Sequence, residues 1–330
     1  ERSVHSMKQK KGFDIGNAVI KRGTGIAMIL ILLILGLRAP LFFSPENIMT
    51  VLKQSGVLVM TALSITTVLI VGGFDMGAGA LVQLTCNIAA GLIISGVNPA
   101  LTWVAGLGIG LVMGLINAIL VVFVKIPTFV TTLGTMYLMT GMTALYNGGS
   151  ALTFELIVNF NMMGQGEILG FPIIFLIVLL FCIALNFFFK HTRTGLRMYA
   201  CGENKNAADI HGIDKRKLMI LGYVISGALL GFTGVLQCSY NYGASAVDYG
   251  MDFLIRALAS AYLGSTFSKT AELSMFGTMI SGVFIAALSN AMVINGFSNQ
   301  IVSGVLGSVL ILSILLTVIK KREIGQVTIF

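Results

Sequence analysis

The sequence predicts an all-α polytopic membrane protein with about ten transmembrane helices and both termini in the cytoplasm. Of its 330 residues, 56% are hydrophobic and 10% are charged, and the mean hydropathy is +0.93. A soluble domain carries about 25% charged residues, so most of this chain is expected to face lipid rather than water. The 39 glycines fit the same class, because small residues let membrane helices approach each other closely.

Ten apolar segments are predicted to span the membrane, because each approaches the roughly 20 residues that a spanning helix needs. The eighth segment is the weakest of them, since it is short and contains Arg256. The segments are Gly23–Phe43, Val51–Val71, Met76–Ser95, Leu101–Val124, Thr128–Asn147, Ile168–Phe189, Leu218–Gln237, Phe253–Gly264, Ser274–Asn295 and Ser298–Ile319.

The positions of Lys and Arg predict the orientation, because cytoplasmic loops are enriched in these residues. With both termini inside, every Lys and Arg except Arg38, Lys53 and Arg256 falls on the cytoplasmic side. The chain then divides into a cytoplasmic N-terminal segment (1–22), a transmembrane domain (23–319) and a cytoplasmic tail (320–330). The acids expected on the outer side are Glu46, Glu155, Glu167 and Asp248.

The segment Lys190–Lys217 is predicted to be the largest cytoplasmic loop, and it holds ten of the 34 charged residues. Its sequence indicates a short helix that Glu203, Asn204 and Lys205 begin and that Gly212 ends in a left-handed conformation. Two uses are open for this helix. It either lies on lipid headgroups, held by Lys215–Lys217, or docks into a cytoplasmic partner.

The sequence contains none of the usual catalytic motifs and no P-loop, so neither enzymatic activity nor ATP hydrolysis is predicted for this chain. The four cysteines are scattered and are expected to be small packing residues, so no metal or other cofactor is predicted. The net charge of +8 comes from short basic segments beside apolar runs, a pattern that favours membrane lipid and not nucleic acid as the charged partner.

Asp75, in the stretch VGGFDMGAGA, is the only clear candidate for an acid within the membrane. It either caps the start of the third spanning helix or shapes a translocation path or gate at a broken helix. The scarcity of such acids disfavours an ion-driven secondary carrier. Two pseudo-repeated halves are also expected, on the weak echo between Leu115–Ala118 and Leu288–Ala291.

A translocation path for a polar solute needs hydrogen-bonding groups among apolar walls. Polar or aromatic residues in segments expected to line the bundle are candidates for it, although the same residues can instead pack the bundle or bond between helices. Together with Asp75, they are Gln83, Asn117, Phe129, Thr132 and Asn290.

Three motifs follow one another along the chain. They are GGFDM at Gly72–Met76, PTFVTTLGT at Pro127–Thr135 and TRTGLRMYACGENKNAADIHGI at Thr192–Ile213. In this order, and with a ten-span layout, they closely resemble the ribose-type permeases of bacterial ABC importers. The third motif is similar to the cytoplasmic loop of that family, which runs T-R-x-G-x-x-x-Y-A-x-G-x-N-x-x-A-A-x-x-x-G-I.

The resemblance implies a permease subunit in the bacterial inner membrane that forms the path as a dimer, with itself or with a related permease. Two P-loop ATPase subunits would bind ATP and Mg²⁺ and dock on the loop, and an extracytoplasmic binding protein would deliver a monosaccharide or similar polyol-like solute. Nucleosides, branched-chain amino acids and a secondary carrier stay open as alternatives. The residues implied in coupling to the ATPase are Gly195, Gly202, Asn204, Ala207, Ala208, Gly212 and Ile213.

The chain departs from this family between Leu263 and Thr278. The family has a glycine-rich loop similar to LGGTSLxGGxG, whereas this chain has LGSTFSKTAELSMFGT, with Lys269 and Glu272 in place of the central glycines. Two explanations are open. Either the contact that this loop makes on the cytoplasmic side differs from the usual one in the family, or the chain pairs with a different permease instead of with itself.

Overall fold

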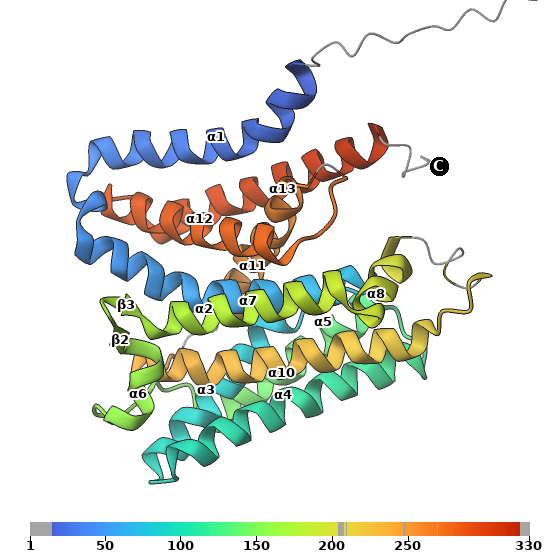
Figure 1. The fold of residues 1–330 in the computed structure, drawn as a ribbon. Helices are drawn as coiled ribbons and strands as arrows, with labels where there is room; N and C mark the ends of the chain where they lie inside the picture. Colours follow the sequence, from blue (N-terminus) through green and yellow to red (C-terminus); the bar gives the residue numbers. More distant parts are fainter. Residues whose placement is uncertain (1–14, 204–207, 209, 247–248, 269, 324–330) are drawn as a thin grey trace, which may run out of the picture.

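The computed structural model describes residues 15–203, 208, 210–246, 249–268 and 270–323. Long helices lie side by side in layers, and short loops join them at the two ends of the bundle (Figure 1). In chain order the helices are α1 (Ile15–Arg38), the 3₁₀ helix η1 (Pro40–Phe43), α2 (Pro45–Ile70), α3 (Ala78–Ile94), α4 (Pro99–Val122), α5 (Thr128–Asn147), α6 (Val158–Gln165), α7 (Ile173–His191), α8 (Arg193–Glu203), α10 (Lys215–Asn241), α11 (Gly250–Ser265), α12 (Met275–Ile294) and α13 (Asn299–Glu323).

Two small antiparallel ladders mark one end of the bundle, which we call the strand end. There β1 (Leu152–Thr153) pairs with β4 (Gly243–Ala244), and β2 (Glu167–Ile168) pairs with β3 (Phe171–Pro172). The ion pair between Lys53 and Glu167, with 2.9 Å between Nζ and Oε1, links the start of α2 to β2. The opposite end, which we call the α8 end, carries α8 and the start of α10 (Figure 1).

Local sequence explains where several helices begin. Ser44 and Asn98 each cap a helix with a side-chain oxygen, and each is followed by proline, which suits the first helical turn because it needs no backbone donor there. Asp214 also caps a helix with a side-chain oxygen: at the start of α10 its carboxylate accepts the backbone N–H groups of Arg216 and Lys217.

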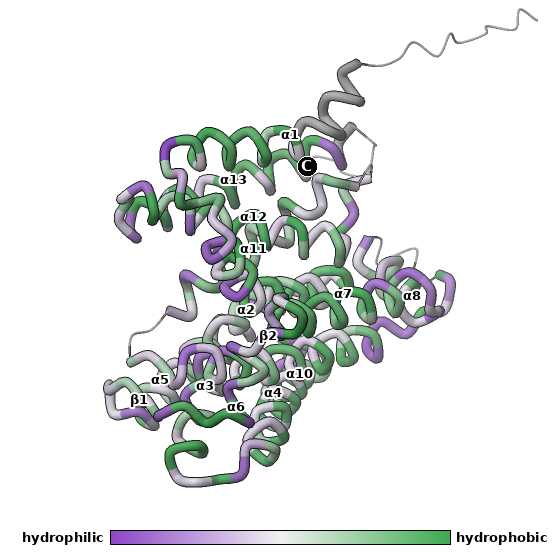
Figure 2. Tube along the Cα trace, turned by 60° about the vertical axis from the view of Figure 1, so that its left-hand side comes forward, coloured by the Kyte–Doolittle hydropathy of each residue, from purple (hydrophilic) through white to green (hydrophobic). Residues whose placement is uncertain are grey.

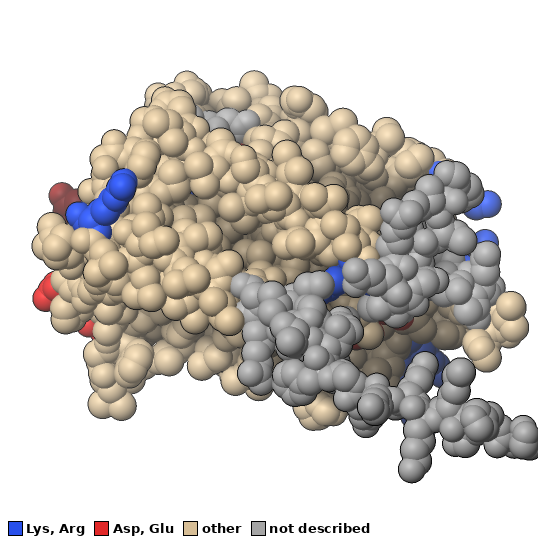
Figure 3. Space-filling model, turned by 90° about the horizontal axis from the view of Figure 1, so that it is seen from above, with Lys and Arg blue, Asp and Glu red and all other residues tan. Residues whose placement is uncertain are grey.

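The surface has the distribution of polar groups that a membrane protein needs. Hydrophobic residues dominate the long helices, whereas α8 and the loops at the strand end carry hydrophilic residues (Figure 2). On the face seen in Figure 3, the visible charged side chains gather toward the two ends, with a broad uncharged band between them. Within the described residues, six helices are long and apolar enough to cross a membrane: α2, α4, α7, α10, α12 and α13.

Each of the ten predicted segments overlaps a different α-helix: α1, α2, α3, α4, α5, α7, α10, α11, α12 or α13; the first segment also includes η1. The boundaries differ where polar residues continue a helix beyond its apolar part. Thus α1 begins at Ile15, inside the predicted N-terminal segment, and α13 continues to Glu323, inside the predicted tail. Glu203 was predicted to begin a helix in the loop; it is instead the last residue of α8, whereas Ala208 and Ile210 are helical just before Gly212.

Helix α2 lies at the centre, in contact with α7, α10, α11 and α12. All its residues from Ser55 to Val68 are buried, so it has no exposed face over this length. Its hydroxyl groups donate to carbonyl oxygens one turn earlier, as Thr61 Oγ1 does to Val57 O at 3.0 Å. These bonds let polar side chains occupy a buried helix without an unpaired donor.

The contact between α4 and α10 depends on glycine. A Cβ atom on Gly110 would lie 2.2 Å from the carbonyl oxygen of Gly227, and one on Gly227 would lie 2.3 Å from the carbonyl oxygen of Gly110. The two backbones therefore touch directly at this crossing. Gly106 and Gly114 continue the contact one turn to either side, which makes the small-residue spacing typical of membrane helix pairs.

We expect Gly110→Ala to force α4 and α10 apart, since the new methyl group would overlap a backbone atom that cannot rotate away. Overpacking of this kind costs about 1–3 kcal/mol. The melting temperature of the purified protein in detergent should fall. Gly108→Ala is the matched control, because a Cβ there meets nothing within 4 Å, and equal melting temperatures for the two variants would contradict the crossing.

Candidate functional site

Helix α8 is fixed against the end of α7. Thr192, between the two helices, accepts the backbone N–H of Gly195 at 3.1 Å and donates its hydroxyl to Phe188 O at 2.6 Å. A Cβ on Gly195 would lie 2.3 Å from the oxygen of Phe188. Glycine at this position lets the chain reverse tightly, so that α8 packs directly on the last turn of α7.

The far end of α8 packs on the end of α2. A Cβ on Gly202 would lie 2.1 Å from the carbonyl oxygen of Ile70, the last residue of α2. Met198 and Cys201, on the same face of α8, are buried. The two glycines of α8 that the family resemblance singled out are thus the points at which its backbone meets two long helices.

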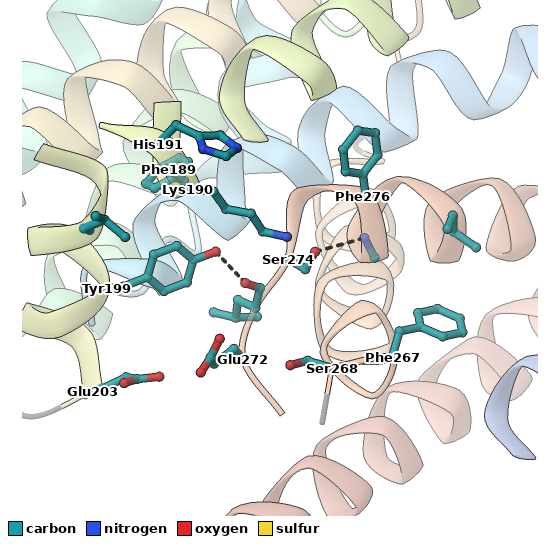
Figure 4. A pocket seen from close by; sticks show the side chains of 14 residues that line it. Phe189, Lys190, His191, Tyr199, Glu203, Phe267, Ser268, Glu272, Ser274 and Phe276 are labelled. Atoms are coloured by element: carbon teal, nitrogen blue, oxygen red, sulfur yellow. Dashed lines mark hydrogen bonds between the residues drawn. The ribbon is translucent and has the colours of Figure 1, made fainter. Parts of the chain in front are cut away.

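A hydrogen bond joins α8 to the connection between α11 and α12. The hydroxyl of Tyr199 donates to the carbonyl oxygen of Leu273 at 2.6 Å (Figure 4). A cavity of about 810 Å³, which we call the α8 groove, lies beside this bond. Its lining residues come from α7, α8, α12 and the α11–α12 connection: Phe189, Lys190, His191, Leu196, Tyr199, Glu203, Phe267, Ser268, Glu272, Leu273, Ser274, Phe276, Gly277 and Ile280.

Two carboxylates face the same part of the α8 groove, Glu203 from α8 and Glu272 from the α11–α12 connection (Figure 4). Partial burial and the charge of Glu272 raise the pKa of Glu203, and the charge of Lys321 partly offsets this shift. Burial, with the charges of both carboxylates, also raises the pKa of the Tyr199 hydroxyl. This hydroxyl therefore stays protonated and able to donate to Leu273 O.

The divergent stretch Leu263–Thr278 keeps its glycines where two backbones touch. A Cβ on Gly264 would lie 2.5 Å from the carbonyl carbon of Gly277, and one on Gly277 would lie 2.4 Å from the oxygen of Gly264. Thr278 also bonds to Thr66 of α2, with 3.1 Å between hydroxyls. Several residues between these glycines, among them Phe267 and Glu272, line the α8 groove. Lys269 lies outside the described residues.

The predicted left-handed helix end at Gly212 is confirmed, with φ of +67°. The N–H of Ile213 donates to Ala208 O at 3.0 Å, the bond that closes a helix at a left-handed glycine. Ala208 is buried, whereas the side chain of Ile210 is 85% exposed. The segment Ala208–Ile213 therefore presents an apolar side chain outward. Asn204 and Ala207, two further predicted coupling residues, lie outside the described residues.

The loop that carries Asp75 joins α2 to α3 next to the end of α8. Gly72 ends α2 with φ of +79°, and Gly73 N donates to Val68 O at 3.0 Å. Asp75 is buried, and its Oδ1 accepts the N–H of Gly77 at 2.9 Å. Because α3 begins at Ala78, this carboxylate supports the turn just before the helix rather than its first turn.

The structure brings Asp75 together with two other predicted residues, Phe129 and Thr132. The hydroxyl of Thr132 accepts Met76 N–H at 3.0 Å, and the ring of Phe129 lies 6.1 Å from that of Phe74. The hydroxyl of Tyr223 in α10 donates to Phe74 O at 2.8 Å. These contacts hold the loop between α5 and α10.

The other predicted path residues lie apart from this loop. Asn117 accepts the Thr135 hydroxyl at 2.9 Å and so bonds α4 to α5. Gln83 is buried within α3. Asn290 accepts from Asn47 Nδ2 at 3.0 Å at the strand end, which joins α12 to α2. The six candidates therefore do not form one site.

Sequence reasoning also missed an ion pair inside the bundle. Arg256 Nε donates to Asp252 Oδ2 at 2.8 Å within α11. Asp252 is thus a second acid on a helix that overlaps a predicted span, beside Asp75. The eighth segment was predicted from Phe253, whereas α11 begins at Gly250 and includes Asp252. The spacing of four residues between the acid and the base was the signal that could have revealed the pair.

A bundle of long apolar helices, with a polar helix held against several of them at one end, defines a multi-pass protein of the cell membrane. The chain matches the family model of branched-chain amino acid transport system permease components over residues 47–315, and it belongs to this family. It is a transmembrane permease subunit with no catalytic role of its own.

Relatives of similar length are import permeases. The ribose import permease protein of Bacillus subtilis is 30% identical over 309 residues, 93% of this chain and 96% of the relative. The D-allose transport system permease protein of Escherichia coli K12 is 29% identical, over 86% of this chain and 87% of the relative. The galactofuranose transporter permease protein of the same strain is 27% identical, over 85% of each chain. No solved structure matches the chain significantly.

We expect Gly202→Ala to separate α8 from α2, because the added methyl group would overlap Ile70 O. Backbone amides of α8 and of the loop after Ile70 should then exchange hydrogen for deuterium faster, since local opening becomes easier. Hydrogen-exchange mass spectrometry of peptides from both regions measures this. Gly134→Ala is the control, since a Cβ there meets nothing within 4 Å; unchanged exchange in Gly202→Ala would contradict the contact.

Proposed function

We propose that this chain forms the translocation path of a bacterial ABC importer for a monosaccharide, such as a ribose-like pentose or a hexose. The observation that carries the proposal is that α8 is held in place by two kinds of contact. Its backbone touches α7 and α2, and the Tyr199 hydroxyl bonds to the α11–α12 connection. A cytoplasmic partner that pushes on α8 would move three parts of the bundle at once. An isolated lipid-surface helix would not need such contacts.

The choice of a sugar rests on the relatives. The family description names branched-chain amino acids, but relatives that match nearly the whole chain are named for ribose, D-allose and galactofuranose. Branched-chain amino acids remain the second candidate because of the family description. The transported sugar itself would be selected largely by the extracytoplasmic binding protein.

The α8 end is assigned to the cytoplasm and the strand end to the outer side. Within the described residues, the basic side chains of α8 and of the neighbouring helix ends make the α8 end the more positive one, as the positive-inside rule requires. In this arrangement α1, α3, α5 and α11 complete ten spans with the six longer helices. Helices α4 and α12, which carry the short sequence echo, would belong to the two halves of the repeat.

Coupling would proceed through the segment Ala208–Ile213 and α8. Each ATPase subunit binds ATP and Mg²⁺, and its closure would press on Ile210, the exposed tip of the segment. Because α8 meets α2 and α7 backbone to backbone, the push would become a rigid-body movement of these helices. A second permease copy, identical or related, would provide the other half of the path, and a binding protein would dock at the strand end.

Asp75, Phe129 and Thr132 are assigned to the cytoplasmic end of the path. The bond from Gly77 N–H to Asp75 supports a structural role, in which the carboxylate holds the α2–α3 loop in place beside α8. Thr132 and Phe129 would keep the same loop against α5. Gln83 and Asn117 are assigned to positions deeper along the path, and Asn290 to its outer end.

Uptake by cells is the test of this function. A host that lacks its own sugar importers, given this chain with its neighbouring ATPase and binding-protein genes, should accumulate at least one of radiolabelled D-ribose, D-allose and D-galactose. Accumulation should stop when the ATPase is inactivated. Uptake of L-leucine alone would favour the second candidate, and uptake that persists without the ATPase would establish a secondary carrier.

We expect Ile210→Asp to weaken docking of the ATPase, because it places a charge where an apolar side chain would be buried against the partner. The loss should be about tenfold or more in the amount of ATPase that copurifies with the tagged permease, since each 1.4 kcal/mol is tenfold in affinity. Leu169→Asp is the matched control. Leu169 is a 96% exposed leucine at the strand end, and equal recovery of ATPase from both variants would contradict the docking site.

A further inference from the structure

A second cavity, of about 200 Å³, lies among α2, α10, α11 and α12. None of the predicted path residues lines it. We call it the outer cavity, and its lining consists of Gln54, Val57, Leu58, Gln237, Tyr240, Phe253, Arg256, Ala286 and Ser289. Five of these nine side chains carry a hydrogen-bonding group, although the surrounding helices are apolar.

The outer cavity lies within the bundle, closer to the strand end than to the α8 end. Gln54 follows the start of α2 by nine residues, and Gln237 precedes the end of α10 by four. With a rise of about 1.5 Å per residue, Gln54 and Gln237 lie roughly 14 and 6 Å along their helices from the strand end. This depth corresponds to the outer half of a hydrocarbon core about 30 Å thick.

Arg256 is held in place by two neighbours. Its Nε donates to Asp252 Oδ2 at 2.8 Å, and its Nη1 donates to Ser289 Oγ at 3.3 Å. Asp252 in turn accepts the Ser303 hydroxyl at 2.8 Å, which ties the pair to α13. The guanidinium has five N–H donors, so these two bonds leave others for a ligand. Because Asp252 balances the charge of Arg256, the outer cavity favours a neutral ligand over an anion.

The lining suits a small polyol. The amides of Gln54 and Gln237 both donate and accept, the guanidinium donates, and the hydroxyls of Tyr240 and Ser289 do either. A sugar hydroxyl also donates and accepts, so each can be paired with a group of the wall. The ring of Phe253 offers a flat apolar surface to the face of a sugar ring that exposes C–H groups. A few convergent polar groups on otherwise apolar walls are typical of small-molecule sites.

We propose that the outer cavity is a monosaccharide-binding site in the outer half of the translocation path. The proposal rests on the proposed sugar-import function and adds the residues that contact the solute. Gln237 and Arg256 bond to its hydroxyls, and Phe253 packs on its ring. Gln54, which is exposed, lies at the rim of the outer cavity. The solute enters from the strand end, where the binding protein releases it.

The location of the outer cavity also connects it to the ATPase side. Helices α11 and α12 form one of its walls through Phe253, Arg256 and Ser289. The opposite ends of the same two helices are joined by the connection whose Leu273 O accepts the Tyr199 hydroxyl of α8. A movement of α8 therefore acts on the helices that line the sugar site and can change its affinity.

The test measures occupancy directly in the purified permease–ATPase complex. Gln54→Cys places a thiol at the outer cavity, and a membrane-impermeant thiol reagent labels it, while the four native cysteines are buried. We expect D-ribose, D-allose or D-galactose to slow this labelling. At twice its dissociation constant a sugar slows labelling about threefold, since the free fraction is 1/(1 + [L]/Kd).

Gln300→Cys is the matched control, because Gln300 is exposed at the strand end of α13 and does not line the outer cavity. Its labelling should not respond to sugar. Gln237→Ala should remove the protection at Gln54→Cys without changing the amount of ATPase that copurifies, which a merely structural role for Gln237 would not explain.

The outcomes separate the site from the function on which it rests. Sugar uptake by cells without protection of Gln54→Cys overturns the outer cavity and leaves the import function standing. Protection by L-leucine alone, with leucine uptake, overturns both the sugar site and the sugar importer. Equal protection of Gln300→Cys shows a general effect of sugar on labelling and overturns the site.

Discussion

In lipid, helices gain little from burying apolar side chains against each other, so close packing must hold them together. This chain achieves it by direct contact of backbones at glycine. Gly110 and Gly227 join α4 to α10, Gly264 and Gly277 join α11 to α12, and Gly202 joins α8 to α2. The same device serves the long helices and α8, so the arrangement of α8 depends on the packing of the helices that it is proposed to move.

A contact between two backbones has a mechanical consequence. Side chains can change rotamer and absorb a small displacement, whereas a carbonyl oxygen within a helix moves only with that helix. A displacement of α8 is therefore passed to α2 at Gly202, while the hydrogen bond from Tyr199 to Leu273 O passes it to α11 and α12. Packed interiors transmit strain because they contain few voids. The route from α8 to the outer cavity therefore uses one backbone contact, at Gly202, and one hydrogen bond, from Tyr199.

Features set by nearby residues could be predicted from the sequence. Hydropathy located a segment in each of the six helices that are long and apolar enough to cross a membrane, because burial in lipid depends on composition over about 20 residues. Gly212 was predicted to end its helix because the left-handed backbone conformation at a helix end favours glycine, a preference that depends on that residue alone. Contacts between distant segments could not be predicted in this way. Asn117 and Asn290 looked equivalent in sequence, yet each bonds to a different helix, at Thr135 and Asn47.

The outer cavity shows that a short segment with one charged residue can contribute to a binding cavity even when its hydropathy makes it a weak candidate for a spanning helix. Arg256 made the eighth segment look like a poor span, since a charged residue within lipid is costly. The structure lowers that cost by pairing Arg256 with Asp252 one turn earlier and by bonding Asp252 to Ser303 of α13. A balanced pair of this kind keeps strong hydrogen-bond donors inside the bundle without attracting ions. That combination is what a path for uncharged polar solutes requires, and it would be lost if either partner were replaced by an apolar residue.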